Sequence, residues 1–263
     1  YILTRMEETG SGYDALFKEA EALGYLEADP NLDVGGIDAA HKLAILSSIA
    51  FGTQVDFHGI DIEGIQRVSL DDIMAAADMG YKIKLLGVTQ MTGRGLEQRM
   101  QPCLVPATSP LGQLDGGTNM IVLEGDAIGQ VVLRGPGAGE GPTASAVLSD
   151  ICDIARGWHG PVFGQKAATL AQPQAALSQR PASFYLRMDL LDKPGALAKI
   201  ATVLGEAGIS IDRMRQTEHR SEKAPVLIVT HKTSRSSLDA ALEAMSGTGV
   251  LASDPVALRI EDL

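Results

Sequence analysis

The chain has 263 residues, 45% of them hydrophobic, and a formal net charge of −11 at pH 7. This length and composition are enough for one large or two ordinary domains with a real core. The negative charge argues against nucleic acid as a partner, because its phosphates would be repelled, and against an anionic membrane surface. Small cationic or zwitterionic partners are compatible with it.

The two cysteines, Cys103 and Cys152, are distant in sequence and match no metal-binding or redox spacing. We therefore expect reduced thiols, a cytoplasmic protein and no metal site. The sequence shows no apolar run of membrane-spanning length and no signal peptide. It begins at Tyr1, and residues 1–6 read as the inside of a helix, so we expect a piece of a longer protein.

The first fifty residues predict mostly helix. Residues 1–24 read as two helices, and residues 27–36 read as a loop because they contain Pro30 and two glycines. Residues 38–52 predict a helix of good helix formers that ends at a glycine. From Leu43 onward this helix is apolar on nearly every side, so we expect it to be buried.

Four carboxylates and one lysine gather around the start of this helix. Asp38 and Lys42 are four residues apart and share a helix face, and the preceding loop can fold Glu27 and Asp33 towards them. A surface ion pair worth about 0.3 to 0.5 kcal/mol, with no functional role, is the ordinary interpretation of such a pair. Calcium is disfavoured, because Val34 stands where an EF-hand loop requires glycine.

The pattern changes to strands between residues 81 and 134. A capping box, Ser69 with Asp72, first opens a helix through residue 78. The predicted strands are residues 82–90, 96–105, 118–125 and 128–135. They predict an antiparallel or mixed sheet backed by the earlier helices, an α+β fold. Alternation in the second strand places polar side chains on one face, which we expect to meet solvent or another subunit: Glu97, Arg99 and Gln101.

A glycine-rich loop follows the last of these strands. It contains Gly137 and Gly139, and a helix with Pro142 as its first residue continues to Arg156. A helix that points its amino end at such a loop suits an anion. The spacing differs from G-x-G-x-x-G, and glycine-rich turns are commonly just turns, so both interpretations stay open. Residues 157–182, rich in glycine, proline, alanine and glutamine, predict a linker.

Residues 183–263 predict a separate unit. Strands and helices follow in the order βαββαβ, which is a ferredoxin-like plan. The turn after the first strand reads D-K-P-G-A-L, from Asp192 to Leu197, and leads into an amphipathic helix that ends at Gly208. Backbone amides at this helix start could hold a carboxylate.

Residues 20–42 resemble the signature segment of homoserine dehydrogenases. The match is carried by Ala20, Gly24-Tyr25, Asp29-Pro30, Asp33, Gly36, Asp38 and Lys42 at the family's spacings. The resemblance implies that Lys42, beside Asp38, is the catalytic general acid/base. It would protonate the substrate oxygen as hydride reaches the aldehyde of aspartate semialdehyde. Glu27, Asp33 and Asp38 would hold the ammonium and hydroxyl groups of the amino acid.

The resemblance covers almost the whole chain and implies a substrate-binding and catalytic domain over residues 1–156. Gly137 and Gly139 would contact the NAD or NADP cofactor. The nucleotide-binding domain would precede this chain, so we expect the chain alone to be inactive. The complete enzyme would be a homodimer or homotetramer that interconverts aspartate 4-semialdehyde and homoserine in threonine and methionine biosynthesis. It would bind neither nucleic acid nor membrane.

The turn at residues 192–197, with G-I-S-I downstream, looks like the ACT domain, a regulatory module that binds amino acids. The resemblance implies an effector site at Asp192, Gly195, Ala196 and Leu197, and the family's pathway suggests threonine. A domain that only dimerises is an equally open interpretation. Another class of function is a non-catalytic amino-acid sensor, which would have no need of a lysine proton shuttle at residue 42.

Overall fold

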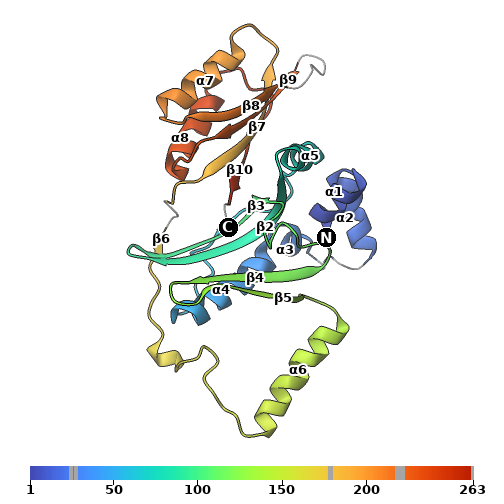
Figure 1. Cartoon of the computed structure of the whole chain (residues 1–263), viewed down its shortest axis with the longest axis vertical. Helices are drawn as coiled ribbons and strands as arrows, with labels where there is room; N and C mark the ends of the chain where they lie inside the picture. Colours follow the sequence, from blue (N-terminus) through green and yellow to red (C-terminus); the bar gives the residue numbers. More distant parts are fainter. Residues whose placement is uncertain (24–25, 27–28, 177–179, 217–222, 262–263) are drawn as a thin grey trace. The chain divides into compact units, whose positions relative to one another are not determined.

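The computed structural model describes residues 1–23, 26, 29–176, 180–216 and 223–261 (Figure 1). The chain forms two compact units. Unit 1 comprises Tyr1–Gln101 and Ala107–Ala176, and unit 2 comprises Pro102–Pro106 and Leu177–Leu263. One strand, β3, therefore begins in unit 1 and ends in unit 2.

Unit 1 combines helices with a mixed sheet and a separate two-stranded ribbon. Its elements in chain order are α1 (Ile2–Thr9), α2 (Tyr13–Ala22), α3 (Asn31–Val34), α4 (Ile37–Phe51), β1 (Asp61–Ile62), α5 (Leu70–Asp78), β2 (Tyr81–Thr92), β3 (Gly95–Pro106), β4 (Thr118–Gly125), β5 (Gly129–Pro136), α6 (Glu140–Ala155), η1 (Ala167–Thr169) and β6 (Ala175–Ala176). β3 pairs with β2 and, in parallel, with β1 and β6, whereas β4 and β5 pair antiparallel with each other. The predicted mixed sheet backed by helices is confirmed.

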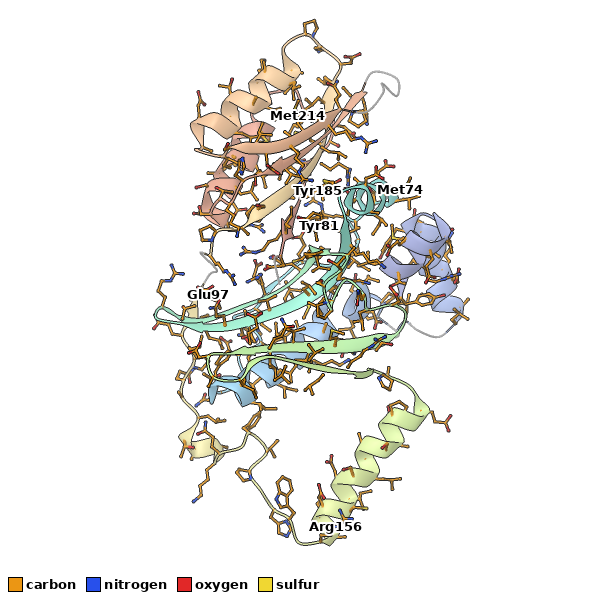
Figure 2. All side chains as sticks on the ribbon, viewed as in Figure 1. Met74, Tyr81, Glu97, Arg156, Tyr185 and Met214 are labelled. Carbon is orange, nitrogen blue, oxygen red and sulfur yellow. The ribbon has the colours of Figure 1, made fainter. Side chains whose placement is uncertain are left out.

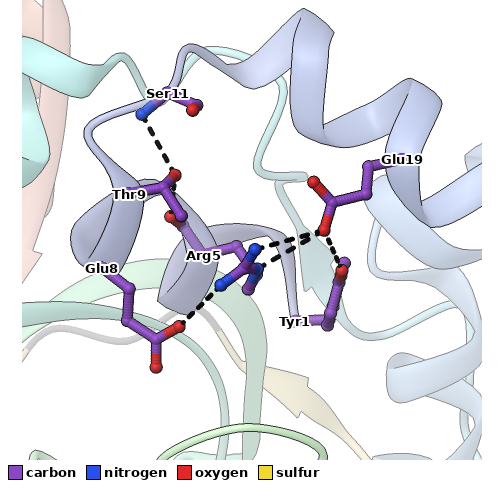
Figure 3. A network of polar contacts seen from close by, with 6 residues as sticks. All are labelled: Tyr1, Arg5, Glu8, Thr9, Ser11 and Glu19. Carbon is purple, nitrogen blue, oxygen red and sulfur yellow. Dashed lines mark hydrogen bonds and ion pairs between the residues drawn. The ribbon is translucent and has the colours of Figure 1, made fainter.

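α1 and α2 are joined by a polar network around Glu19 (Figure 3). Arg5 contacts Glu8 at 3.2 Å and Glu19 at 3.4 Å, and the hydroxyl of Tyr1 donates a hydrogen bond to Glu19. The hydrogen bond from Tyr1 and the charge of Arg5 lower the pKa of the Glu19 carboxyl. Because the Arg5 and Glu19 side chains are 35% and 39% exposed, solvent screens the network and it contributes little to stability.

Local signals in the sequence account for several helix ends. Ser69 and Asp72 form the predicted capping box at the start of α5, with the Ser69 amide donating to the Asp72 carboxylate at 2.8 Å. α4 ends at Gly52, which has the left-handed backbone of a C-cap. The loop expected at residues 27–36 differs, because residues 31–34 form the short helix α3.

α4 is buried on one face only, so the prediction of a buried helix is wrong for its outer side. Ala40 and Leu43 are buried in a cluster with Met100, whereas Ile45 and Ile49 are 47% and 49% exposed. The helix contacts β2, and a sheet covers only the side of a helix that lies on it. The apolar residues on the outer side of α4 stay uncovered in this chain.

The polar face of β3 also departs from the prediction. Glu97 and Gln101 are only 4% and 5% exposed, so the prediction that these two side chains face solvent or another subunit is wrong. β3 has neighbours on both sides, and its polar side chains bond within unit 1. The Arg94 guanidinium contacts the Glu97 carboxylate at 2.9 Å, and the side-chain amide of Gln101 donates to the Asp61 carboxylate at 2.7 Å. Burial of these groups is tolerated because they have partners.

Unit 2 has the predicted βαββαβ order. Its elements are β7 (Ser183–Leu191), α7 (Ala196–Glu206), β8 (Ile211–Gln216), β9 (Lys223–Thr230), α8 (Arg235–Ser246) and β10 (Val256–Ile260). The sheet has the order β10-β7-β9-β8 with antiparallel neighbours. One core joins alternate residues of β7 and β9 to α7 and α8. The last part of β3 adds to this sheet, because Cys103 pairs with Arg259 of β10 in parallel.

Candidate functional site

The structure brings Asp38 and Lys42 together on the first two turns of α4. The Nζ atom of Lys42 lies 2.7 Å from Oδ2 of Asp38, and the two side chains are 59% and 44% exposed. The ammonium group has three donors and Asp38 takes one of them. A cation held on one side by a carboxylate and open on the other can donate to a ligand oxygen.

The backbone at the start of α4 places this pair. Gly36 has a φ of 76°, which turns the chain from α3 directly into α4. A residue with a side chain rarely adopts this left-handed conformation. Asp38 then lies in the first turn, where a carboxylate interacts favourably with the positive end of the helix.

The other predicted acidic residues are placed differently. Asp33 lies on α3, partly buried, and its carbonyl oxygen accepts a hydrogen bond from the Gly36 amide at 3.1 Å. The prediction for Glu27 lies outside the described residues. The structure thus establishes the contact between Lys42 and Asp38.

Two further lysines in unit 1 were not singled out from the sequence. Lys84 on β2 donates to the carbonyl oxygen of Leu114 at 2.6 Å, and burial, with the nearby charge of Lys82, lowers its pKa. Lys82 contacts Glu7 at 3.4 Å and Asp115 at 3.3 Å. The alternation K-I-K, which places both lysines on one strand face, was the signal that could have drawn attention to them.

The predicted cofactor glycines lie at the start of α6. Gly139 precedes this helix with a φ of 121°, and Glu140 is its first residue, so Pro142 is the third residue and not the first as predicted. A Cβ atom on Gly137 would lie 1.8 Å from Nδ2 of Asn119, so the space beside Gly137 is taken by that side chain. Gly139 is exposed, and the helix start behind it can offer amides to an anion.

α6 is exposed along nearly its whole length in the described part of the chain. Figure 2 shows its side chains projecting away from the ribbon, and none of its residues is buried. Leu148 and Ile151 are 59% and 54% exposed. An amphipathic helix with uncovered large apolar side chains is typical of a surface that another domain or subunit covers.

Unit 2 contains a cavity of about 290 Å³ at the turn between β7 and α7. All four predicted effector residues line it: Asp192, Gly195, Ala196 and Leu197. Gln216 at the end of β8 also lines the cavity, and sequence reasoning missed it because its proximity depends on strand pairing. Gly195 precedes α7 with a φ of 84°, and the Ala196 amide bonds to the carbonyl of Lys193 at 3.1 Å. The next two amides of the helix have no partner within it.

The remaining candidate groups carry no site. In the part of the chain that the structure describes, every helix is too short or too polar to cross a membrane. Among the described side chains, no group of three or more His, Cys, Asp or Glu could hold a metal ion. Cys103 is buried and Cys152 is exposed, and both are thiols that form no disulfide within the described residues.

Residues 1–152 match the family model described as homoserine dehydrogenase, and residues 184–248 match the ACT domain. The chain belongs to the homoserine dehydrogenase family. The resemblance seen in the sequence, including its ACT domain, is confirmed at this level.

Relatives in the homoserine dehydrogenase family align with the entire chain. The homoserine dehydrogenases of Neisseria gonorrhoeae and Pseudomonas aeruginosa are each 38% identical over 100% of this chain, which is 62% and 63% of their own lengths. The crystal structure of a homoserine dehydrogenase from Thiobacillus denitrificans has a TM-score of 0.89 at 36% identity and covers 100% of this chain and 61% of that one. The chain therefore spans about three fifths of the length of these relatives.

The turn into α7 makes a testable prediction about unit 2. Gly195→Ala should lower the free energy of unfolding by about 1 kcal/mol, because alanine is strained at a φ of 84°. Nothing lies within 4 Å of the added methyl group, so the loss would come from backbone strain and not from a clash. Gly205→Ala is the matched control within α7, and it should raise stability by up to about 1 kcal/mol. Urea denaturation that ranked Gly195→Ala as equal to or above the control would contradict this account.

Proposed function

We propose that this chain is the substrate-binding and catalytic part, joined to an ACT regulatory domain, of an NAD(P)-dependent homoserine dehydrogenase. Residues 1–156 would form the catalytic domain, residues 157–182 a linker and residues 183–263 the ACT domain. Family membership supports the reaction, and the ion pair between Lys42 and Asp38 is the observation that supports its chemistry.

The proposed reaction interconverts aspartate 4-semialdehyde and homoserine. The nicotinamide, when bound, supplies a hydride to the aldehyde carbon. Lys42 donates a proton from its ammonium group to the aldehyde oxygen, so that the C=O bond becomes the C–OH of homoserine. In the reverse direction the neutral amine accepts that proton. Asp38 holds the amine in place at 2.7 Å. With Glu27 and Asp33, Asp38 would also attract the substrate's ammonium group.

The exposed start of α6 fits an anionic part of NAD or NADP. Gly139 is exposed, and the helix behind it presents amides at its positive end. We assign Gly137 and Gly139 to the cofactor-binding loop. The Asn119 side chain occupies the space beside Gly137, so this position has no room for a side chain of its own.

We also propose a setting for the complete protein. It would act in the cytoplasm, in the biosynthesis of threonine and methionine, as a homodimer or homotetramer. The uncovered apolar residues on α4 and α6 support an assembly, since Ile49 and Ile151 are about half exposed in this chain. Reduced thiols at Cys103 and Cys152 agree with a cytoplasmic location.

The role of Lys42 is tested by replacing it in the complete enzyme. Lys42→Ala should lower kcat by at least about 100-fold, because proton transfer by a positioned side chain contributes that much or more. The fold should survive because the side chain is 59% exposed. Lys18→Ala, which removes an exposed lysine from α2, is the matched control and should keep the wild-type rate. The measurement is the absorbance of the reduced nicotinamide with homoserine as substrate.

Most of the wild-type kcat remaining in Lys42→Ala would remove Lys42 from the mechanism. A complete wild-type protein that reduced no nicotinamide with homoserine would instead favour the other class of function, an amino-acid sensor in which unit 1 is a scaffold.

For the ACT domain we propose threonine as the effector. The support is the cavity of about 290 Å³ lined by Asp192, Gly195, Ala196 and Leu197. The amides at the start of α7 would bind the threonine carboxylate, and Asp192 would bind its ammonium group.

Calorimetric titration of the complete protein with threonine tests this site. Binding heat is expected for the wild type, and it should disappear in Asp192→Ala because the ammonium group loses its anionic partner. Asp239→Ala, on the exposed side of α8, is the control and should bind as the wild type does. An absence of heat with threonine and related amino acids would favour a domain that only dimerises.

A further inference from the structure

Met100 lies beneath the start of α4. It is 3% exposed, on the unit 1 part of β3, and it belongs to one apolar cluster with Ala40 and Leu43 of that helix. Ala40 lies between Asp38 and Lys42 in the sequence, and Leu43 follows Lys42 directly. The buried side of the turn that carries the ion pair therefore rests on this methionine.

Two glycines make the space that Met100 fills. A Cβ atom on Gly36 would lie 3.3 Å from Cγ of Met100, and a Cβ atom on Gly87 of β2 would lie 2.6 Å from its Cε. The same atom on Gly87 would lie 3.2 Å from Cδ1 of Leu43. The thioether thus reaches from the backbone at the start of α4 to the backbone of β2. We call this space the glycine slot, defined by Gly36 and Gly87.

The glycine slot constrains where α4 begins. Gly36 has a left-handed φ of 76°. The first turn of the helix is therefore fixed both by this backbone conformation and by the packing of Met100 against it. Protein interiors are close-packed, and a change of a few atoms is transmitted to the neighbouring backbone. Methionine, unbranched and polarizable, suits a narrow and irregular space of this kind.

We propose that Met100 is a positioning residue, which sets the place of the Asp38 and Lys42 pair by filling the glycine slot. The inference rests on the proposed function, because it acts through the proton transfer assigned to Lys42. With 3% of its surface exposed, Met100 would act through α4 and not by contact with substrate or cofactor.

The first test compares two buried methionines in the complete enzyme. Met100→Ala should lower kcat by about 10- to 100-fold, the loss expected from a misplacement of about 1 Å. Met6→Ala removes the same atoms from α1, where Met6 is 0% exposed, and should keep the wild-type kcat. Both variants should lose thermal stability. An unchanged kcat in Met100→Ala, with a loss of stability like that of Met6→Ala, would overturn the inference.

The second test is a double variant in which one substitution restores the kcat that the other lowers. Gly87→Ala places a methyl group 2.6 Å from Cε of Met100, so it should displace the thioether and lower kcat. Met100→Leu has no atom at that end, and in the Gly87→Ala background it should recover most of the lost rate. Two changes in contact are expected to be non-additive in this way. Additive losses of kcat in the double variant would overturn the inference, even if Met100→Ala fails to fold.

These outcomes separate the inference from the proposed function. Turnover retained in Lys42→Ala would refute the proton transfer assigned to Lys42, on which the inference rests. Turnover lost in Lys42→Ala but retained in Met100→Ala would refute the positioning role alone.

Discussion

The ion pair between Lys42 and Asp38 is the interaction on which the functional account of this chain depends. A surface pair of this kind contributes little to stability, and both partners are about half exposed. Its position in the fold is what matters for the proposed function. It follows a glycine with a left-handed backbone, and it lies on a helix whose inner face packs on Met100 and the sheet. The inner side of α4 is therefore packed against the sheet, whereas Lys42 lies on an exposed side of the same helix.

Much of the architecture follows from signals within a few residues of one another. The capping box at Ser69, the end of α4 at Gly52 and the βαββαβ order of unit 2 were all predictable, because each depends on local hydrogen bonding or on periodicity. Two of the wrong predictions concern burial. The composition of α4 does not indicate that a sheet covers only one side of this helix. The alternation in β3 could not tell that neighbouring strands and Asp61 enclose Gln101.

Some residues of the candidate sites were predictable from the sequence and others were not. Asp38 and Lys42 were predictable as a pair because four residues make one helical turn, and the family resemblance gave them a role. Gln216 at the cavity and Lys84 beside Leu114 were not, because strand pairing and loop contacts bring them into place. Both units share β3, which supports α4 through Met100 and pairs with β10 through Cys103. One strand therefore takes part in the structure of unit 1 and of unit 2.

The central claim is that Lys42 exchanges a proton with the substrate oxygen. A crystal structure of the complete enzyme with homoserine and the nicotinamide cofactor bound tests it most directly. The account predicts that Nζ of Lys42 lies within about 3 Å of the homoserine hydroxyl oxygen, the reach of a direct proton transfer. A bound homoserine whose hydroxyl group meets another side chain, with the Lys42 ammonium turned to solvent, would contradict it.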